Sequence, residues 1–183
     1  MIIKLPELTN FYSDHNRRSE IAVMNALCHF YNFEPGSVAR GYFSDWDFSI
    51  QLSENRIITF ELKISASGTT NGSIELARAD GRASGLTATK SDYYIFLNSA
   101  GNIGKLRIIP TKELKTFYKS PKNTFTTQTN GDKIGSLLAP LNFKNFNDIM
   151  ILECDYNSNK QEFNTDTFKP NSYAKRMIHN YIR

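Results

Sequence analysis

The sequence feature that most limits the fold is a strict two-residue alternation over residues 56–65. Its apolar side chains are Ile58, Phe60, Leu62 and Ile64, and between them lie Thr59, Glu61 and Lys63. Successive side chains of a β-strand point to opposite faces of a sheet. The stretch is therefore predicted to be a strand that buries one apolar face and places Glu61 and Lys63 together on the other.

A second alternating stretch precedes this one and is predicted to pair with it as an antiparallel hairpin. Residues 38–52 and 56–65 would form the strands, and residues 53–55 the turn. Facing residues in such a hairpin point the same way, and with this turn their numbers sum to about 108. Asp47 then faces Glu61 and Asp45 faces Lys63, whereas a slip by two residues makes Asp47 face Lys63. In either register Asp47 lies within about 5 Å of the pair at the level of the Cβ atoms.

The rest of the chain mixes helical and strand patterns. Helices are predicted from Asp14 to about Tyr31 and over residues 111–120, where Thr111 would cap the start; strands are predicted over residues 73–79, 92–98, 104–110 and 148–156. We expect an α/β fold with a mixed central sheet flanked by helices. Residues 1–156 would form this domain, and residues 157–183 a polar linker and a short basic amphipathic C-terminal segment.

Composition narrows the class of protein only mildly. The net charge of +4 favours a polyanionic partner. Two scattered cysteines, Cys28 and Cys154, indicate buried, reduced thiols rather than a disulfide framework. No apolar run approaches the roughly 20 residues of a membrane span, and the N-terminal residues lack the apolar region of a signal peptide. We therefore expect a cytoplasmic protein without a membrane partner.

The hairpin brings together residues that suit metal-assisted hydrolysis. Two carboxylates, on Asp47 and Glu61, offer hard oxygen ligands of the kind that Mg²⁺ and Mn²⁺ prefer. A bound metal lowers the pKa of its water, and an ammonium such as that of Lys63 can orient the water or stabilise charge. The alternative interpretation is a polar sheet face on which these residues form a cross-strand salt bridge.

Three other acidic residues have alternatives of their own. Glu20 lies on the same helical stripe as apolar residues, which favours a site residue, although a partly exposed position near the helix start is equally compatible. Glu75 would be either an extra acid near the metal or a partner of Arg78 or Arg82. Glu113 belongs to a second Glu-x-Lys triplet, in a lysine-rich helical pattern that we interpret as a solvated face.

The succession of Glu20, Asp47 and the triplet Glu61-Leu62-Lys63 resembles the PD-(D/E)XK nuclease superfamily, also called the restriction-endonuclease-like fold. The segment GRASGLTATKSDYYIFL, residues 81–97, is also similar to a stretch of phage and bacterial nucleases of this group. Trp46 stands where the family motif has proline. The resemblance implies a mixed sheet that carries the motif on its second and third strands, and an Mg²⁺-dependent DNA endonuclease in which Mn²⁺ substitutes.

The resemblance also implies a role for each motif residue. Asp47, Glu61 and the backbone carbonyl of Leu62 would ligate the metal, Lys63 would act on the attacking water, and Glu20 would support the site. Basic residues are candidates for DNA phosphate contacts: Arg78, Arg82, Lys90, Lys175 and Arg176. DNA is the expected partner, and a homodimer is compatible with a small enzyme of this type. The alternative is a noncatalytic nucleic-acid-binding module that retains the fold.

Overall fold

The computed structural model describes residues 2–4, 15–39, 45–65, 68, 70–78, 80–120, 128–129, 136–157, 159–160 and 162–170. The helices in these ranges are α1 (His15–Tyr31), α2 (Thr111–Lys119) and the 3-10 helix η1 (Phe143–Phe146). The strands are β1 (Ile2–Lys4), β2 (Glu34–Val38), β3 (Phe48–Ser53), β4 (Arg56–Ser65), β5 (Asn71–Arg78), β6 (Tyr93–Ala100), β7 (Ile103–Pro110), β8 (Gln128–Thr129), β9 (Ser136–Asn142), β10 (Leu152–Asn157) and β11 (Glu162–Pro170).

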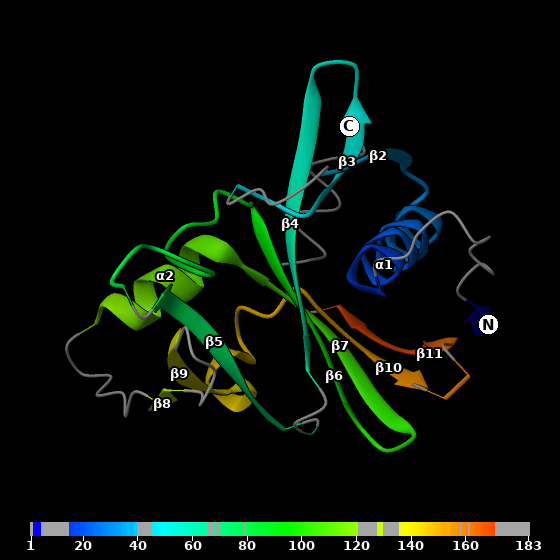
Figure 1. The fold of residues 1–183 in the computed structure, drawn as a ribbon. Helices are drawn as coiled ribbons and strands as arrows, with labels where there is room; N and C mark the ends of the chain where they lie inside the picture. Colours follow the sequence, from blue (N-terminus) through cyan, green and yellow to red (C-terminus); the bar gives the residue numbers. More distant parts are fainter. Residues whose placement is uncertain are drawn as a thin grey trace.

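Two sheets organise the described residues. The larger has eight strands in the order β1-β11-β10-β7-β6-β4-β3-β2 and is strongly curled (Figure 1). Its neighbours are antiparallel except β4 and β6, which run parallel. The smaller sheet is antiparallel, in the order β5-β9-β8. The fold is therefore mixed α/β, with a mixed sheet as expected.

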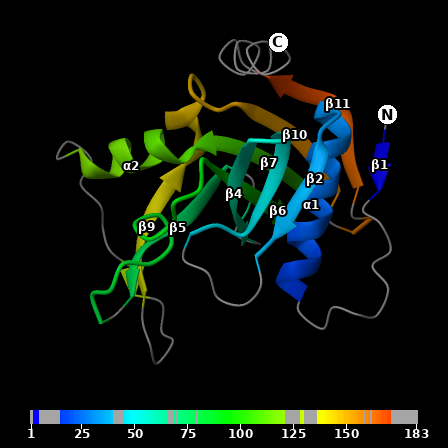
Figure 2. The ribbon, with the colours of Figure 1, turned by 90° about the horizontal axis from the view of Figure 1, so that it is seen from above.

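Helix α1 packs on one face of the large sheet, which we call the α1 face (Figure 2). The helix has nearly the predicted length, and Val23 and Leu27, 0% and 1% exposed, are buried against the sheet. The strand residues in this core include Phe48, Phe60, Ile95, Leu106 and Leu152. No helix in the described ranges is long and apolar enough to cross a membrane.

The opposite face of the large sheet, the α2 face, is covered by α2, η1 and the small sheet (Figure 2). Leu114 of α2 is fully buried there, against a core that includes Tyr94, Phe96, Ile109, Ile74 and Leu141. The expectation that Thr111 caps α2 is wrong. Pro110 occupies the N-cap position, and Thr111 is the first helical residue, with its hydroxyl 3.1 Å from that of Ser91.

The predicted hairpin and its register are confirmed. Phe48 pairs with Phe60 and Ile50 with Ile58, so facing residues follow the first of the two registers considered. The first strand is shorter than predicted, because β3 begins at Phe48. Of the expected range 38–52, Val38 instead ends β2, and residues 40–44 lie outside the described part of the chain.

The C-terminal part differs from the predicted linker. Residues 162–170 form β11, which pairs with β10 on one side and β1 on the other. Phe163 of this strand is fully buried in the core of the α1 face, which explains why a segment rich in polar residues is held in the sheet. The late strand β10 begins at Leu152, four residues after the predicted start. The expected basic segment after Pro170 lies outside the described residues.

A charged network joins β7 to β10. The Arg107 Nε atom lies 2.7 Å from Glu153, and the Lys105 ammonium lies 3.3 Å from Glu153 and 2.6 Å from Asp155. Arg107 is only 5% exposed, and its guanidinium stacks 4.3 Å from the ring centre of Phe143. Burial acts to raise the pKa of Glu153 and is the largest single influence, but the guanidinium of Arg107 and the ammonium of Lys105 together lower it. This network ties the two strands together.

Candidate active site

Strand β4 places Glu61 and Lys63 on the α2 face of the large sheet. In the parallel pairing with β6, Glu61 lies beside Tyr94 and Lys63 beside Phe96, and both aromatic rings belong to the core under α2. Phe60, 4% exposed, points the other way into the core under α1. The predicted opposite orientation of Phe60 and of the pair Glu61 and Lys63 is therefore confirmed. The apolar face is not buried throughout, because Ile64 near the end of β4 is 41% exposed.

Asp47 lies directly before β3 and continues its pairing with β4. Its amide N donates a hydrogen bond to the Phe60 carbonyl at 2.8 Å. Its carboxylate Oδ2 accepts a hydrogen bond from the Leu62 amide N at 2.6 Å. This second bond holds the carboxylate against the backbone of β4, at the residue that follows Glu61.

The negative charges of Asp47 and Glu61 oppose each other. Burial is the main cause of a pKa of Glu61 raised to about 8, and the charge of Asp47 is the second. The Thr89 hydroxyl counteracts the increase, Glu20 adds to it, and Lys63 counteracts it to the smallest extent. The charges of Asp47, Glu20 and Lys63 therefore all act on Glu61. The two negative charges outweigh the positive charge of Lys63.

Such an excess of negative charge at a half-buried position is relieved by a proton or by a cation. Asp47 and Glu61 supply carboxylate oxygens, and Mg²⁺ commonly binds proteins through one or two carboxylates while keeping several waters. The donor chemistry of this pair therefore fits Mg²⁺. A complete cage of protein ligands is not formed, because no group of three or more His, Cys, Asp or Glu side chains in the described part of the chain is placed to hold an ion.

Thr89 is a site residue that the sequence did not reveal. It is fully buried, and its hydroxyl oxygen lies 3.0 Å from Glu61 Oε2 and 2.9 Å from the Asp45 carbonyl. The Ser91 amide donates to the same oxygen at 3.2 Å. A hydroxyl carries a single proton, so it donates to one of the two oxygens at a time. Thr89 thus fixes Glu61 and, through Asp45, the segment that precedes β3.

Lys115 of α2 also lies next to the site. Its ammonium donates a hydrogen bond to the Thr89 carbonyl at 2.5 Å. Burial is the main cause of a lowered pKa of Lys115, the charge of Lys119 lowers it further, and Glu61 acts in the opposite direction. From the sequence, the second Glu-x-Lys triplet, Glu113-Leu114-Lys115, is expected to be part of a solvated helix face. For Lys115 this interpretation is wrong. The spacing of Lys115 with the other lysines of α2 is visible in the sequence. The spacing alone does not reveal that the segment around Thr89 faces this side of the helix.

The remaining acidic candidates are distributed more widely. Glu20 is partly buried on α1 and contributes through its charge on Glu61. Glu75 Oε1 accepts a hydrogen bond from the Ser136 hydroxyl at 3.1 Å, which ties β5 to β9. Arg82, one of the two arginines expected near Glu75, is exposed and forms an ion pair with Asp80.

The other predicted phosphate contacts lie at the surface or outside the described ranges. Arg78 is exposed at the end of β5. Lys90 forms an ion pair with Asp45 at 3.1 Å and lines a pocket with Lys115. Lys175 and Arg176 lie beyond the residues that the structure describes, so their roles stay predictions.

Comparisons of the chain with protein-family models, with curated proteins and with solved structures found no match.

Proposed function

We propose that the protein is an Mg²⁺-dependent DNA endonuclease of the PD-(D/E)XK type, with a restriction-endonuclease-like fold. The observation that carries the proposal is the charge arrangement at Glu61. A half-buried carboxylate is held by Thr89 beside the charge of Asp47, with Lys63 on the same face of β4. The PD-(D/E)XK motif requires two acidic residues followed by a lysine, on two strands that pair in this register.

Each residue has a chemical role in this proposal. Asp47 and Glu61 would hold the Mg²⁺ ion, with the Leu62 carbonyl as a further ligand. The ion lowers the pKa of a bound water and offsets charge on the phosphate under attack. The Lys63 ammonium would orient the nucleophile and stabilise the negative charge that develops. Glu20 would support the site from α1, through a water or a second ion.

The local contacts keep these groups in place before substrate binds. The Leu62 amide fixes the carboxylate of Asp47, and the Thr89 hydroxyl fixes that of Glu61. Preorganised charged groups cost little reorganisation when the transition state forms, which is the main source of electrostatic catalysis. The β3–β4 hairpin is therefore a suitable support for hydrolysis of a phosphodiester bond.

The proposal is tested by incubating the purified protein with supercoiled plasmid, single-stranded DNA and a four-way junction, in Mg²⁺, Mn²⁺ or EDTA. We expect cleavage with either metal and none in EDTA. Asp47→Asn and Glu61→Gln keep the side-chain shapes and should abolish cleavage. Glu54→Gln is the matched control, because Glu54 is an exposed carboxylate in the turn of the same hairpin. DNA binding without metal-dependent cleavage would instead support the noncatalytic module.

A further inference from the structure

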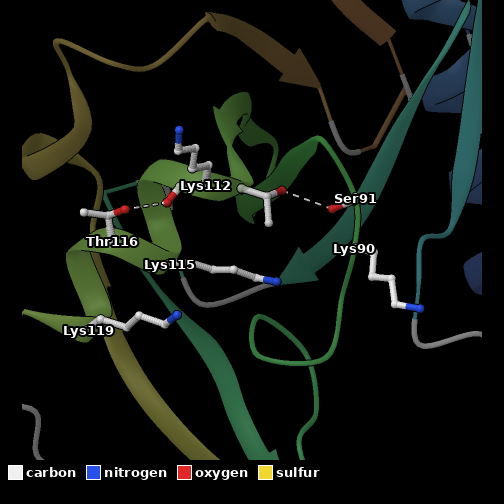
Figure 3. Close-up of a pocket in the computed structure, with 7 residues that line it drawn as sticks. Lys90, Ser91, Lys112, Lys115, Thr116 and Lys119 are labelled. Carbon is white, nitrogen blue, oxygen red and sulfur yellow. Dashed lines mark hydrogen bonds between the residues drawn. The ribbon is translucent and has the colours of Figure 1, made fainter.

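We infer that a lysine-lined pocket on α2 binds a phosphate group of the nucleic-acid strand next to the phosphodiester that is cut. The pocket has a volume of about 310 Å³ and is lined by Lys90, Ser91, Thr111, Lys112, Lys115, Thr116 and Lys119, which we call the lysine pocket (Figure 3). The inference rests on the proposed function for the identity of the strand, but its evidence is a separate set of residues.

The spacing of the lysines along α2 creates one cationic face. Lys112, Lys115 and Lys119 are three and four residues apart, which places them on the same side of a helix. The opposite side carries the fully buried Leu114. Figure 3 shows the side chains of Lys115 and Lys119 extending in the same direction from α2. The core contacts of Leu114 therefore determine which side of α2 faces the pocket. Lys112 extends in a different direction from Lys115 and Lys119.

The lining of the pocket matches an anion. Its seven residues comprise four lysines and three hydroxyl side chains and include no carboxylate, although the Lys90 ammonium already forms an ion pair with Asp45. The hydroxyls of Ser91 and Thr111 lie 3.1 Å apart inside this lining. The charge of Lys119 contributes to the lowered pKa of Lys115, which is the effect expected of like charges close together. A phosphate oxygen would relieve this repulsion and accept hydrogen bonds from the ammonium groups.

The volume indicates more than a single small ion. The volume of the lysine pocket, about 310 Å³, lies at the lower end of the range of roughly 300 to 1,000 Å³ that is typical of ligand pockets. A phosphate with its attached sugar fits this space better than an isolated phosphate.

The position of the pocket connects it to the candidate active site. Lys115 Nζ donates to the carbonyl of Thr89, and the hydroxyl of the same Thr89 lies 3.0 Å from Glu61 Oε2. One residue therefore separates the lysine pocket from a metal-binding carboxylate. A strand with one phosphate at Asp47 and Glu61 would bring a neighbouring phosphate to the lysines.

The test measures DNA binding without cleavage. Fluorescence anisotropy with a labelled 20-nucleotide single strand and the matching duplex is recorded in Ca²⁺, which fills oxygen sites, over a series of salt concentrations. The variant Lys112→Gln/Lys119→Gln should weaken binding and lower the slope of log K against log salt by about one unit for each phosphate that is no longer neutralised. The matched control is Lys144→Gln/Lys160→Gln, which removes the same charge from exposed positions outside the pocket.

Further measurements separate the possible outcomes. Thermal unfolding must show the same midpoint for both double variants, so that a weaker affinity reports binding and not misfolding. Equal affinity and equal salt slope in the two double variants would overturn the inference, even if plasmid cleavage is normal. A lower salt slope in the pocket variant, but not in the control variant, supports the inference. This holds even if the protein does not cleave DNA with any metal and the proposed function fails.

Oligonucleotides with a 5′-phosphate or a 5′-hydroxyl identify the source of the phosphate. We expect both to bind equally and to be weakened equally in the pocket variant, as for a phosphate within the strand. A preference for the 5′-phosphate that disappears in Lys112→Gln/Lys119→Gln would support the pocket and assign it to a strand end.

Discussion

Replacing Glu61 by glutamine should stabilise the metal-free protein at alkaline pH. The carboxylate has a pKa raised from 4.5 to about 8, first by burial and then by the charge of Asp47. A carboxyl group whose pKa is higher in the folded than in the unfolded chain binds more protons when folded, so stability falls as pH rises between these two values. Glutamine keeps an oxygen that can face Thr89 but carries no charge at any pH.

The size of the effect follows from the same pKa values. One pKa unit corresponds to about 1.4 kcal/mol, so full ionisation of Glu61 costs on the order of 3 to 5 kcal/mol of unfolding free energy. Urea denaturation has slopes of about 1 to 3 kcal/mol per M that rise with chain length. With a slope near the upper end of this range, Glu61→Gln should raise the urea midpoint at pH 9 by about 1 to 2 M in EDTA. At pH 4 the two proteins should unfold at nearly the same urea concentration.

The control for the urea experiment is a carboxylate that is exposed. Glu54→Gln removes an exposed carboxylate from the hairpin turn and should leave the urea midpoint unchanged across the pH range. Added Mg²⁺ should recover stability in the wild type at pH 9 but much less in Glu61→Gln, because an ion that binds the folded state stabilises it. If the wild type and Glu61→Gln keep a constant difference from pH 4 to pH 9, the pKa of Glu61 is not raised as described.

Further perturbations have equally defined outcomes. Lys63→Ala should remove most plasmid cleavage and leave DNA affinity in Ca²⁺ nearly unchanged, and near-normal cleavage would exclude a role of Lys63 in the chemical step. Glu113→Ala should retain nearly full cleavage in the same assay, and a loss as large as that of the motif variants would contradict the chosen triplet. Glu153→Ala should lower the free energy of unfolding by about 2 to 3 kcal/mol in urea titrations, because a buried guanidinium loses its carboxylate. The Cys28 and Cys154 thiols, with pKa values raised mainly by burial to about 11 and about 12, should react with Ellman's reagent only on unfolding, and rapid native-state labelling would contradict their burial.

The hairpin could be predicted because alternation and register constrain each other. A slip by one residue would turn Glu61 and Lys63 into the apolar core under α1 and remove Phe60 from that core. The same pattern could not locate the start of β3. Alternation continues through Asp45 and Asp47, although the regular strand begins only at Phe48.

Thr89 could not be predicted because its role depends on a contact across 28 residues of sequence. No local pattern identifies which strand will pair in parallel with β4, and therefore none brings Thr89 to Glu61. The lysines of α2 present a related difficulty. Three- and four-residue spacing is the same for a solvated helix face and for a cationic pocket, and only the segment around Ser91 distinguishes them.

Strand β11 was missed for a different reason. Its composition is polar, and local propensity therefore favours a linker over residues 157–171. Pairing with β10 and with β1 at the opposite end of the chain supplies its hydrogen bonds, and buried Phe163 anchors it. Long-range pairing of this kind overrides the local preference.

The parallel pairing of β4 with β6 also has a consequence for the order of folding. The β3–β4 hairpin closes through a short turn, so we expect Asp47 to meet β4 early, while its carboxylate and that of Glu61 remain hydrated. Residues 66–92 must be organised before β6 can join β4, and contacts across so long a connection form slowly. We therefore expect the repulsion at Glu61 to develop fully only after the main folding barrier, when β6 and Thr89 exclude water. Neutralising Glu61 should accordingly lengthen the lifetime of the native state without accelerating folding.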